Sequence, residues 1–243
     1  MLFIIDVIQK LIPKEIFGLN ILTDQMGNFS KTIIYISSNR EDPDFEHKIQ
    51  RALLESCREL PIVAVTQKPV VLGKKCKNIV VGDRKCSGFN FCRQNLIACE
   101  AAETDVVISA ESDCLYSPDY FEFRPKRLDI PYRNTNIYVQ KYGRDYFCKK
   151  SMSTFSQVVG REFYIKRLKE LLKNQPVWGV EMKNFPKEIK KPLFEEFEFF
   201  ETKNPCITFK TGRGMRKHSN SDEIPVYELP YWGRTKDIVE RYL

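Results

Sequence analysis

Short apolar runs alternate with longer segments of helical periodicity from residue 31 onward, and this alternation constrains the fold more than any other feature. The apolar runs predicted to be strands are residues 33–36, 60–69, 77–83 and 104–110. Helical patterns fill residues 42–59 and 87–103. Strands that alternate with helices are typical of a mostly parallel sheet with helices on both faces. The chain is therefore predicted to be an α/β protein.

The predicted helices begin with recognisable capping residues. Asp42 is expected to cap the first helix, with Pro43 at its first position. Apolar side chains recur every four residues along this helix and give it one buried face: Phe45, Ile49, Leu53 and Cys57. Ser87 is the expected cap of the second helix.

Polar segments follow three of the predicted strands, at residues 37–40, 67–69 and 111–113. Ligands of open parallel sheets gather at the carboxyl ends of the strands. Three polar loops at one edge of the sheet are what a nucleotide pocket requires, so we expect the binding site there.

The third of these segments carries two carboxylates one residue apart, Glu111 and Asp113. Both can point toward one hard cation, because Mg²⁺ and Mn²⁺ prefer oxygen ligands and commonly bridge a carboxylate to substrate phosphates. Alternatively, they cap the next segment or form surface ion pairs. Their position after a buried strand favours the metal site.

The second half of the chain is less regular. A hairpin is predicted at residues 134–147 and a helix at 160–174. Residues 193–201 fit either a helix or a strand, and residues 206–219 a strand followed by a basic loop. With no repeat or clear linker, residues 31–243 are expected to form one compact domain after an N-terminal extension, residues 1–30.

Charge and cysteine content narrow the function classes. A net charge of +7 fits either a solvated surface or an anionic partner. Eight cysteines without a Cys-x-x-Cys pair, and only two histidines, argue against a zinc cluster and for free thiols in the cytoplasm. The sequence has no run of about 18 apolar residues, so no membrane-spanning helix is predicted.

Two blocks of the sequence resemble the GT-A glycosyltransferases, which transfer sugars from nucleotide diphosphates, and most of all their simple inverting bacterial and viral members. The block "IIYISSNR" resembles the opening strand and nucleotide loop of that family. Residues 87–121 resemble its helix, strand and acidic motif, with Arg93 and Asn95 as the Arg-x-Asn and Glu111 in place of the usual Asp. The resemblance implies a Rossmann-like nucleotide-sugar half at residues 31–121 and an acceptor half at residues 122–243.

The resemblance also implies roles for individual residues. Asp113 would bind Mn²⁺ or Mg²⁺, and Glu111 would contact the ribose or a water on the metal. Ser37, Asn39 and Arg40 would line the base and ribose pocket. Late residues of the basic loop would complete the site, with His218 as a further metal ligand and Arg213 or Arg216 over the diphosphate. Arg93 would lie near the diphosphate or sugar, or be a solvated helix residue.

An inverting transfer needs a carboxylate that takes the proton of the acceptor. By resemblance, Glu181 is the first candidate and Asp145 the second, and Trp178 could stack on a sugar ring. Glu181 could equally be a surface glutamate, and His218 a surface histidine.

The acceptor is left open between a small molecule, a polysaccharide end and a hydroxylated base in DNA. The basic run from Lys203 to Lys217, with Tyr142, Tyr146 and Phe147, would suit a phosphate backbone. A nucleotidyltransferase would usually show a glycine-rich loop after its first strand, and "ISSNREDPD" has no glycine. A nucleotide-binding module without catalysis is the remaining alternative.

Overall fold

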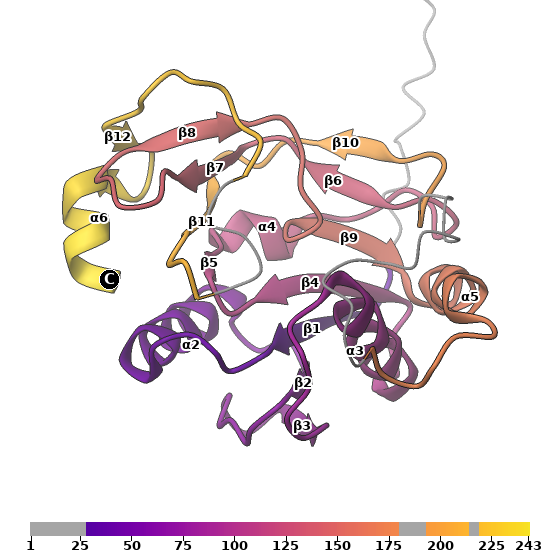
Figure 1. The fold of residues 1–243 in the computed structure, drawn as a ribbon. Helices are drawn as coiled ribbons and strands as arrows, with labels where there is room; N and C mark the ends of the chain where they lie inside the picture. Colours follow the sequence, from indigo (N-terminus) through magenta and orange to yellow (C-terminus); the bar gives the residue numbers. More distant parts are fainter. Residues whose placement is uncertain (1–27, 180–192, 214–218) are drawn as a thin grey trace, which may run out of the picture.

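A seven-stranded sheet forms the centre of the protein (Figure 1). The computed structural model describes residues 28–179, 193–213 and 219–243. Across the sheet, the strands follow the order β10 (Glu198–Phe200), β6 (Tyr132–Asn134), β9 (Gln157–Gly160), β4 (Val106–Glu111), β1 (Lys31–Ser37), β2 (Ile62–Thr66) and β3 (Cys76–Val80). β9 is antiparallel to both neighbours, and the other neighbouring strands are parallel. The predicted mostly parallel sheet is therefore confirmed.

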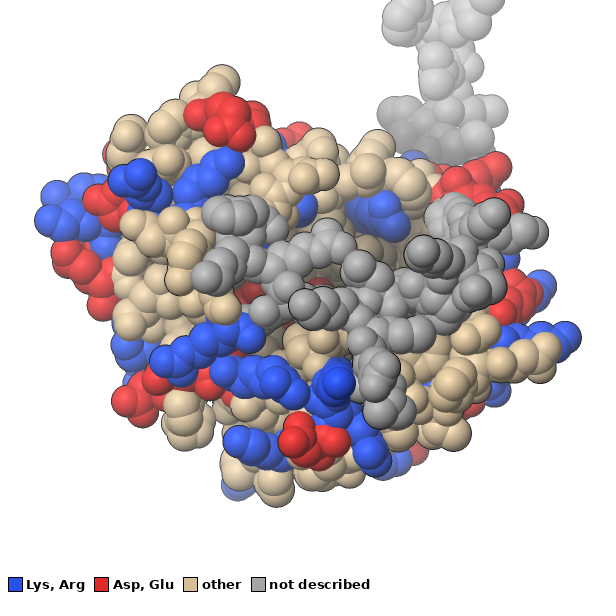
Figure 2. Space-filling model, in the orientation of Figure 1, with Lys and Arg blue, Asp and Glu red and all other residues tan. Residues whose placement is uncertain are grey.

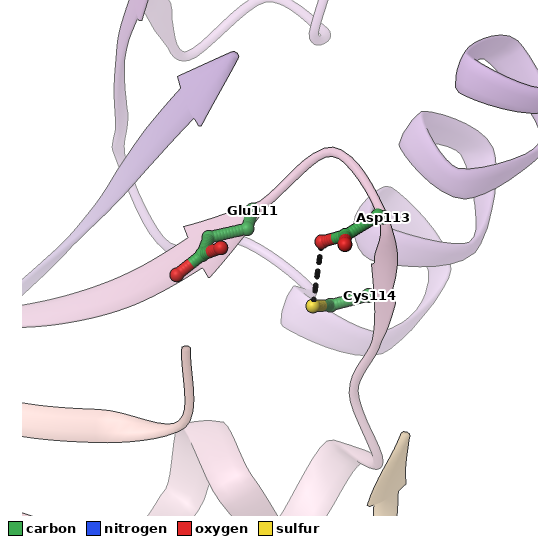
Figure 3. Close-up of side chains that lie close together, drawn as sticks. All are labelled: Glu111, Asp113 and Cys114. Carbon is green, nitrogen blue, oxygen red and sulfur yellow. Dashed lines mark hydrogen bonds between the residues drawn. The ribbon is translucent and has the colours of Figure 1, made fainter. Parts of the chain in front are cut away.

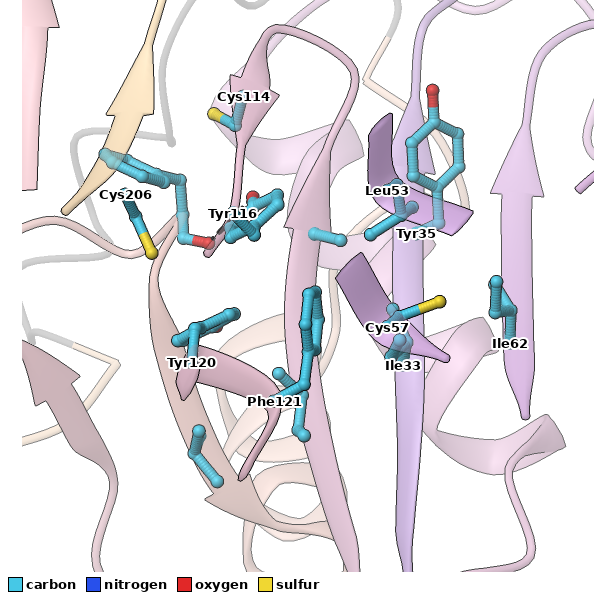
Figure 4. Packing of buried hydrophobic residues seen from close by; sticks show 14 of the residues in the cluster. Ile33, Tyr35, Leu53, Cys57, Ile62, Cys114, Tyr116, Tyr120, Phe121 and Cys206 are labelled. Atoms are coloured by element: carbon cyan, nitrogen blue, oxygen red, sulfur yellow. Dashed lines mark hydrogen bonds between the residues drawn. The ribbon is translucent and has the colours of Figure 1, made fainter. Parts of the chain in front are cut away.

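Helices cover both faces of this sheet, as predicted. α2 (Pro43–Cys57) and α4 (Pro118–Glu122) pack on one face, where side chains of alternate β1 residues join the cluster drawn in Figure 4. α3 (Gly88–Ala101) and α5 (Arg161–Leu172) pack on the other face. Ile33 and Tyr35 therefore belong to one core cluster and Ile34 and Ile36 to the other. A strand buried on both faces needs the continuous apolar run seen in the sequence.

The predicted helix caps are present. The Asp42 carboxylate accepts a hydrogen bond from the Asp44 amide at 3.0 Å, and the Ser87 hydroxyl accepts one from Asn90 at 3.1 Å. α2 ends at Cys57, two residues before the predicted end. The chain turns there because Arg58 has a φ of 55°, outside the helical region.

A second, four-stranded sheet lies beside the first, and the sequence did not predict it. Its order is β5 (Cys114–Leu115), β11 (Cys206–Thr208), β7 (Ile137–Gln140) and β8 (Phe147–Lys150). β7 and β8 are the predicted hairpin, and β11 is the predicted late strand. Residues 193–201, left open between helix and strand, contain β10 of the main sheet.

α2 is packed between the two sheets. A third core cluster joins Phe45 and Ile49 of α2 to Ile207, Phe209 and the C-terminal helix α6 (Thr235–Tyr242). A short hairpin, β12 (Glu228–Leu229) and β13 (Gly233–Arg234), leads into α6. The described residues thus form a single α/β domain.

The eight cysteines are unpaired, and six of them are buried. Within the described ranges, no helix has the length and apolar character needed to cross a membrane. Of the predicted N-terminal extension, only residues 28–30 are among those described.

Candidate active site

The acidic segment forms a turn between the two sheets. Glu111 is the last residue of β4, and β5 begins at Cys114, directly after Asp113 (Figure 3). The Asp113 carbonyl accepts a hydrogen bond from the Phe209 amide at 2.8 Å. Pairing of β5 with β11 therefore fixes the turn to a part of the chain nearly one hundred residues away.

A lysine of that distant segment is the positive partner of the turn. The Lys210 ammonium lies 3.4 Å from an Asp113 carboxylate oxygen, and both side chains are largely buried, 16% and 24% exposed. The Thr208 hydroxyl is 3.4 Å from the same oxygen. Lys210 belongs to the basic run noted in the sequence, but its contact with Asp113 could not be predicted, because the two residues are 97 positions apart.

Burial and the charges of the turn shift the pKa values of Glu111 and Lys210. Burial, together with the charge of Asp113, raises the pKa of Glu111 to about 8, although Lys210 opposes the shift. Burial alone would lower the pKa of Lys210, but Asp113 and its other neighbours outweigh burial and raise it. Glu111 therefore holds its proton to a higher pH than an ordinary carboxyl group does, while Lys210 stays charged.

The turn offers ligand atoms suited to a hard cation. Carboxylate oxygens of Glu111 and Asp113 and the Cys114 sulfur lie within 4.8 Å of one another. Burial and the two carboxylates raise the pKa of Cys114, so it remains a thiol that donates to Asp113 at 3.1 Å. The two carboxylates are thus the ligands that fit Mg²⁺ or Mn²⁺. A metal here would share Asp113 with Lys210.

The loop after β1 is held by the buried carboxylate of Glu46 on α2. One Glu46 oxygen accepts hydrogen bonds from the Ser37 hydroxyl at 2.6 Å and from the Asn39 amide at 3.1 Å. The Asn39 side-chain oxygen, Oδ1, accepts a hydrogen bond from the backbone amide of Lys68 at 2.9 Å and so joins this loop to the one after β2. Ser37 and Asn39, predicted to line the base pocket, thus have hydrogen-bond partners within the protein.

A basic and aromatic cluster lies beyond this loop. Arg40 donates to the Arg84 carbonyl at 3.1 Å, and the Arg84 guanidinium lies 5.0 Å from the ring centre of Trp178. Arg84 was not predicted, and it already occupies a face of Trp178, the predicted sugar-stacking residue. Figure 2 shows lysine and arginine gathered below the centre of this side of the protein, with acidic groups among them.

Other predicted site residues have partners outside the acidic turn or lie outside the described ranges. Arg93 donates to the Pro176 carbonyl at 3.0 Å, and burial lowers its pKa. The neighbouring Asn95 amide bonds within its own helix, to Phe91 at 2.8 Å. Arg213 pairs with Asp42 at 3.2 Å. The remaining three lie outside the described residues: Glu181, Arg216 and His218.

A hollow of about 690 Å³ opens beside Lys210. It is lined by Asp145, the second candidate base, and by Tyr142 and Arg213. Tyr142 is 41% exposed, but Phe147, which the sequence grouped with it, is fully buried in the third core cluster. The part of the phosphate-backbone prediction that relied on Phe147 is therefore wrong.

No protein-family model and no curated protein matches the sequence. Among solved structures, the protein is similar to one assigned as a glucose-1-phosphate thymidylyltransferase from Bacillus anthracis, with a TM-score of 0.46 and 10% identity over 80% of this chain and 98% of that one. It is similar to the inositol-1-phosphate CTP transferase of T. maritima, with a TM-score of 0.45 and 12% identity over 76% and 91% of the two chains. It also resembles the glycosyltransferase GlyE of Streptococcus pneumoniae, with a TM-score of 0.39 and 13% identity over 72% of this chain and 46% of GlyE.

Proposed function

We propose that the protein is a metal-dependent glycosyltransferase that moves a sugar from a nucleotide-diphosphate donor to an acceptor hydroxyl, with inversion at the anomeric carbon. The observation that carries the proposal is the acidic turn at the carboxyl end of β4, next to the joined loops after β1 and β2. Sheets of this kind bind nucleotides at that edge.

Asp113 and Glu111 would hold Mn²⁺ or Mg²⁺, with His218 as a further ligand. When bound, the ion would stabilise negative charge on the departing nucleoside diphosphate. Lys210 places a second positive charge 3.4 Å from Asp113, where it would also meet the diphosphate. Arg213 and Arg216 would add charge from the same loop.

The remaining roles belong to residues around the acidic turn. Arg40, together with Ser37 and Asn39 of the same loop, would border the base and ribose of the donor nucleotide. A carboxylate, Glu181 or Asp145, would accept the proton of the attacking hydroxyl. The role of Asp145 as this base is supported by its position, because it lines the same hollow as Lys210.

The loop after β1 favours glycosyl over nucleotidyl transfer. A nucleotidyltransferase places the triphosphate of its substrate on a glycine-rich loop whose backbone amides face the phosphates. Residues 37–45 contain no glycine, and the side chains of Ser37 and Asn39 fill the loop with internal hydrogen bonds.

The test is nucleoside diphosphate release from a panel of nucleotide sugars with Mn²⁺ or Mg²⁺. We expect release from at least one donor, its loss with EDTA, and a fall of about 100-fold or more in Asp113→Asn, because a charged ligand has been removed. Asp129→Asn is the matched control, since Asp129 is exposed and pairs with Arg127.

Two results would contradict the proposal. Pyrophosphate release from nucleoside triphosphates and sugar phosphates, with no turnover of nucleotide sugars, would assign nucleotidyl transfer instead. Donor binding without turnover under any metal condition would assign a binding module.

A further inference from the structure

A second hollow of about 430 Å³ lies beside α6 and shares one lining residue with the hollow beside Lys210. That residue is Asp145, in the turn of the β7–β8 hairpin, and we call the two hollows together the groove. Each volume falls in the range of about 300–1,000 Å³ that small-molecule sites occupy. Lys210 joins the groove to the acidic turn through its contact with Asp113.

The ionic side chains of the groove balance one another. Five are acidic and five are basic. Four of the basic side chains pair with carboxylates at 2.9–3.7 Å: Lys210 with Asp113, Arg213 with Asp42, Arg234 with Asp237, and Lys236 with Glu240. Arg144 is the one groove cation to which the described residues give no ion pair. A polyanion such as DNA requires an excess of unpaired positive charge, which this surface does not offer.

Aromatic and neutral polar groups also line the groove. Tyr142 lines the hollow beside Lys210, and Tyr227, 62% exposed, lines the hollow beside α6. Tyr227 packs against Tyr146 edge to face, which holds its ring in place. Gln140 and Thr211 add neutral hydrogen-bonding groups. A tyrosine offers an apolar face and a polar tip, and carboxylate and amide groups bond to hydroxyls.

We propose that the groove binds a neutral saccharide. Rings with apolar faces and many hydroxyl groups match tyrosine faces and fixed carboxylates without requiring net charge. That the saccharide is the acceptor rests on the proposed glycosyl transfer, since the groove leads to Lys210 and Asp113. Binding of the saccharide to the groove does not depend on the proposed glycosyl transfer.

The test measures saccharide binding without any donor. Wild-type protein is titrated with maltotetraose, cellotetraose, laminaritetraose and N-acetylchitotetraose, and binding is followed by saturation-transfer NMR and calorimetry. We expect at least one to bind, and Tyr227→Ala to weaken it about tenfold through the lost ring contact. Glu240→Gln, a second groove variant with unchanged shape, should weaken it several-fold through a weaker hydrogen bond.

The control is Phe199→Ala, which removes a ring 57% exposed on the edge strand β10 and should leave binding unchanged. Matching unfolding midpoints would show that each variant is folded. Absence of binding by the whole panel, or equal binding in wild type and both groove variants, would overturn the proposal. So would tight binding of a hydroxymethylcytosine duplex that both groove variants lose. Donor turnover, measured separately, decides the proposed function, so the two can fail independently.

Discussion

Glu111 ends a buried strand with a carboxyl group that burial and the neighbouring Asp113 make harder to ionise. Its pKa is raised to about 8 in the folded protein, against 4.5 for the ordinary group. Between these values the folded state binds more protons than the unfolded state, so the free energy of unfolding falls as pH rises. Bound metal would oppose this fall, because it favours the ionised carboxylate.

We expect Glu111→Gln to remove this decrease of the free energy of unfolding with rising pH. In urea unfolding with a chelator, wild type should lose stability relative to the variant as pH rises from about 5 to about 8. The other titrating groups are common to both proteins, so the difference between the two curves isolates Glu111. Parallel curves would show that the pKa of Glu111 is not raised.

The residues of the site also show which of its features could be predicted from the sequence and which could not. Asp113 and Glu111 could be predicted because they follow a recognisable strand. Lys210 could not be paired with them, because its position depends on β11 meeting β5 across the fold. The role of Glu46 could not be predicted either, because its buried carboxylate anchors the loop after β1 through contacts made only in the fold.

At the element scale, Gly160 joins β9 to α5 where there is no room for a side chain. A Cβ atom there would lie 1.9 Å from the carbonyl oxygen of Leu128, a backbone atom that cannot turn away. Gly160→Ala should therefore destabilise the protein by about 1–3 kcal/mol or more through forced backbone movement. Chemical unfolding measures the loss.

Gly143 in the β7–β8 turn is the control for this prediction. Its φ is 69°, but a Cβ atom would meet nothing within 4 Å. Gly143→Ala should cost only the strain of the left-handed backbone, about 1 kcal/mol. If Gly160→Ala cost no more than Gly143→Ala, the close approach to Leu128 would be wrong.

Elements with local signals were predictable, and those that depend on distant partners were not. Apolar runs and caps located β1, α2, α3 and β4, because each depends on its own sequence. The antiparallel pairing of β9 with β4 in the main sheet and the pairing of β5 with β11 depend on contacts between residues far apart in the chain. Strands of two to four residues carry too little periodicity to show which sheet they join.

At the scale of the whole molecule, α2 makes the two sheets one cooperative unit. Leu53 and Cys57 contribute to the core of the main sheet, and Phe45 and Ile49 to the core of the second. Loss of either sheet would expose one side of α2. We therefore expect a single unfolding transition for both sheets.

The two tryptophans make this testable. Trp178 stacks with Arg84 near the main sheet, and Trp232 packs against the third core cluster. In Trp178→Phe the remaining tryptophan is Trp232, and in Trp232→Phe it is Trp178. Within each variant, the fluorescence and circular dichroism midpoints should coincide. Separate midpoints would mean that the second sheet unfolds independently.

The pairing of Asp113 with Lys210 has a consequence for synthesis on the ribosome. Strands β1 to β4 and the acidic turn leave the exit tunnel long before Lys210, 97 residues behind Asp113. A nascent chain can build this edge of the sheet while Asp113 still lacks its cationic partner. Since domains fold as the chain emerges, the acidic turn is completed among the last steps. A divalent ion that binds these carboxylates during translation would reach them before Lys210 does.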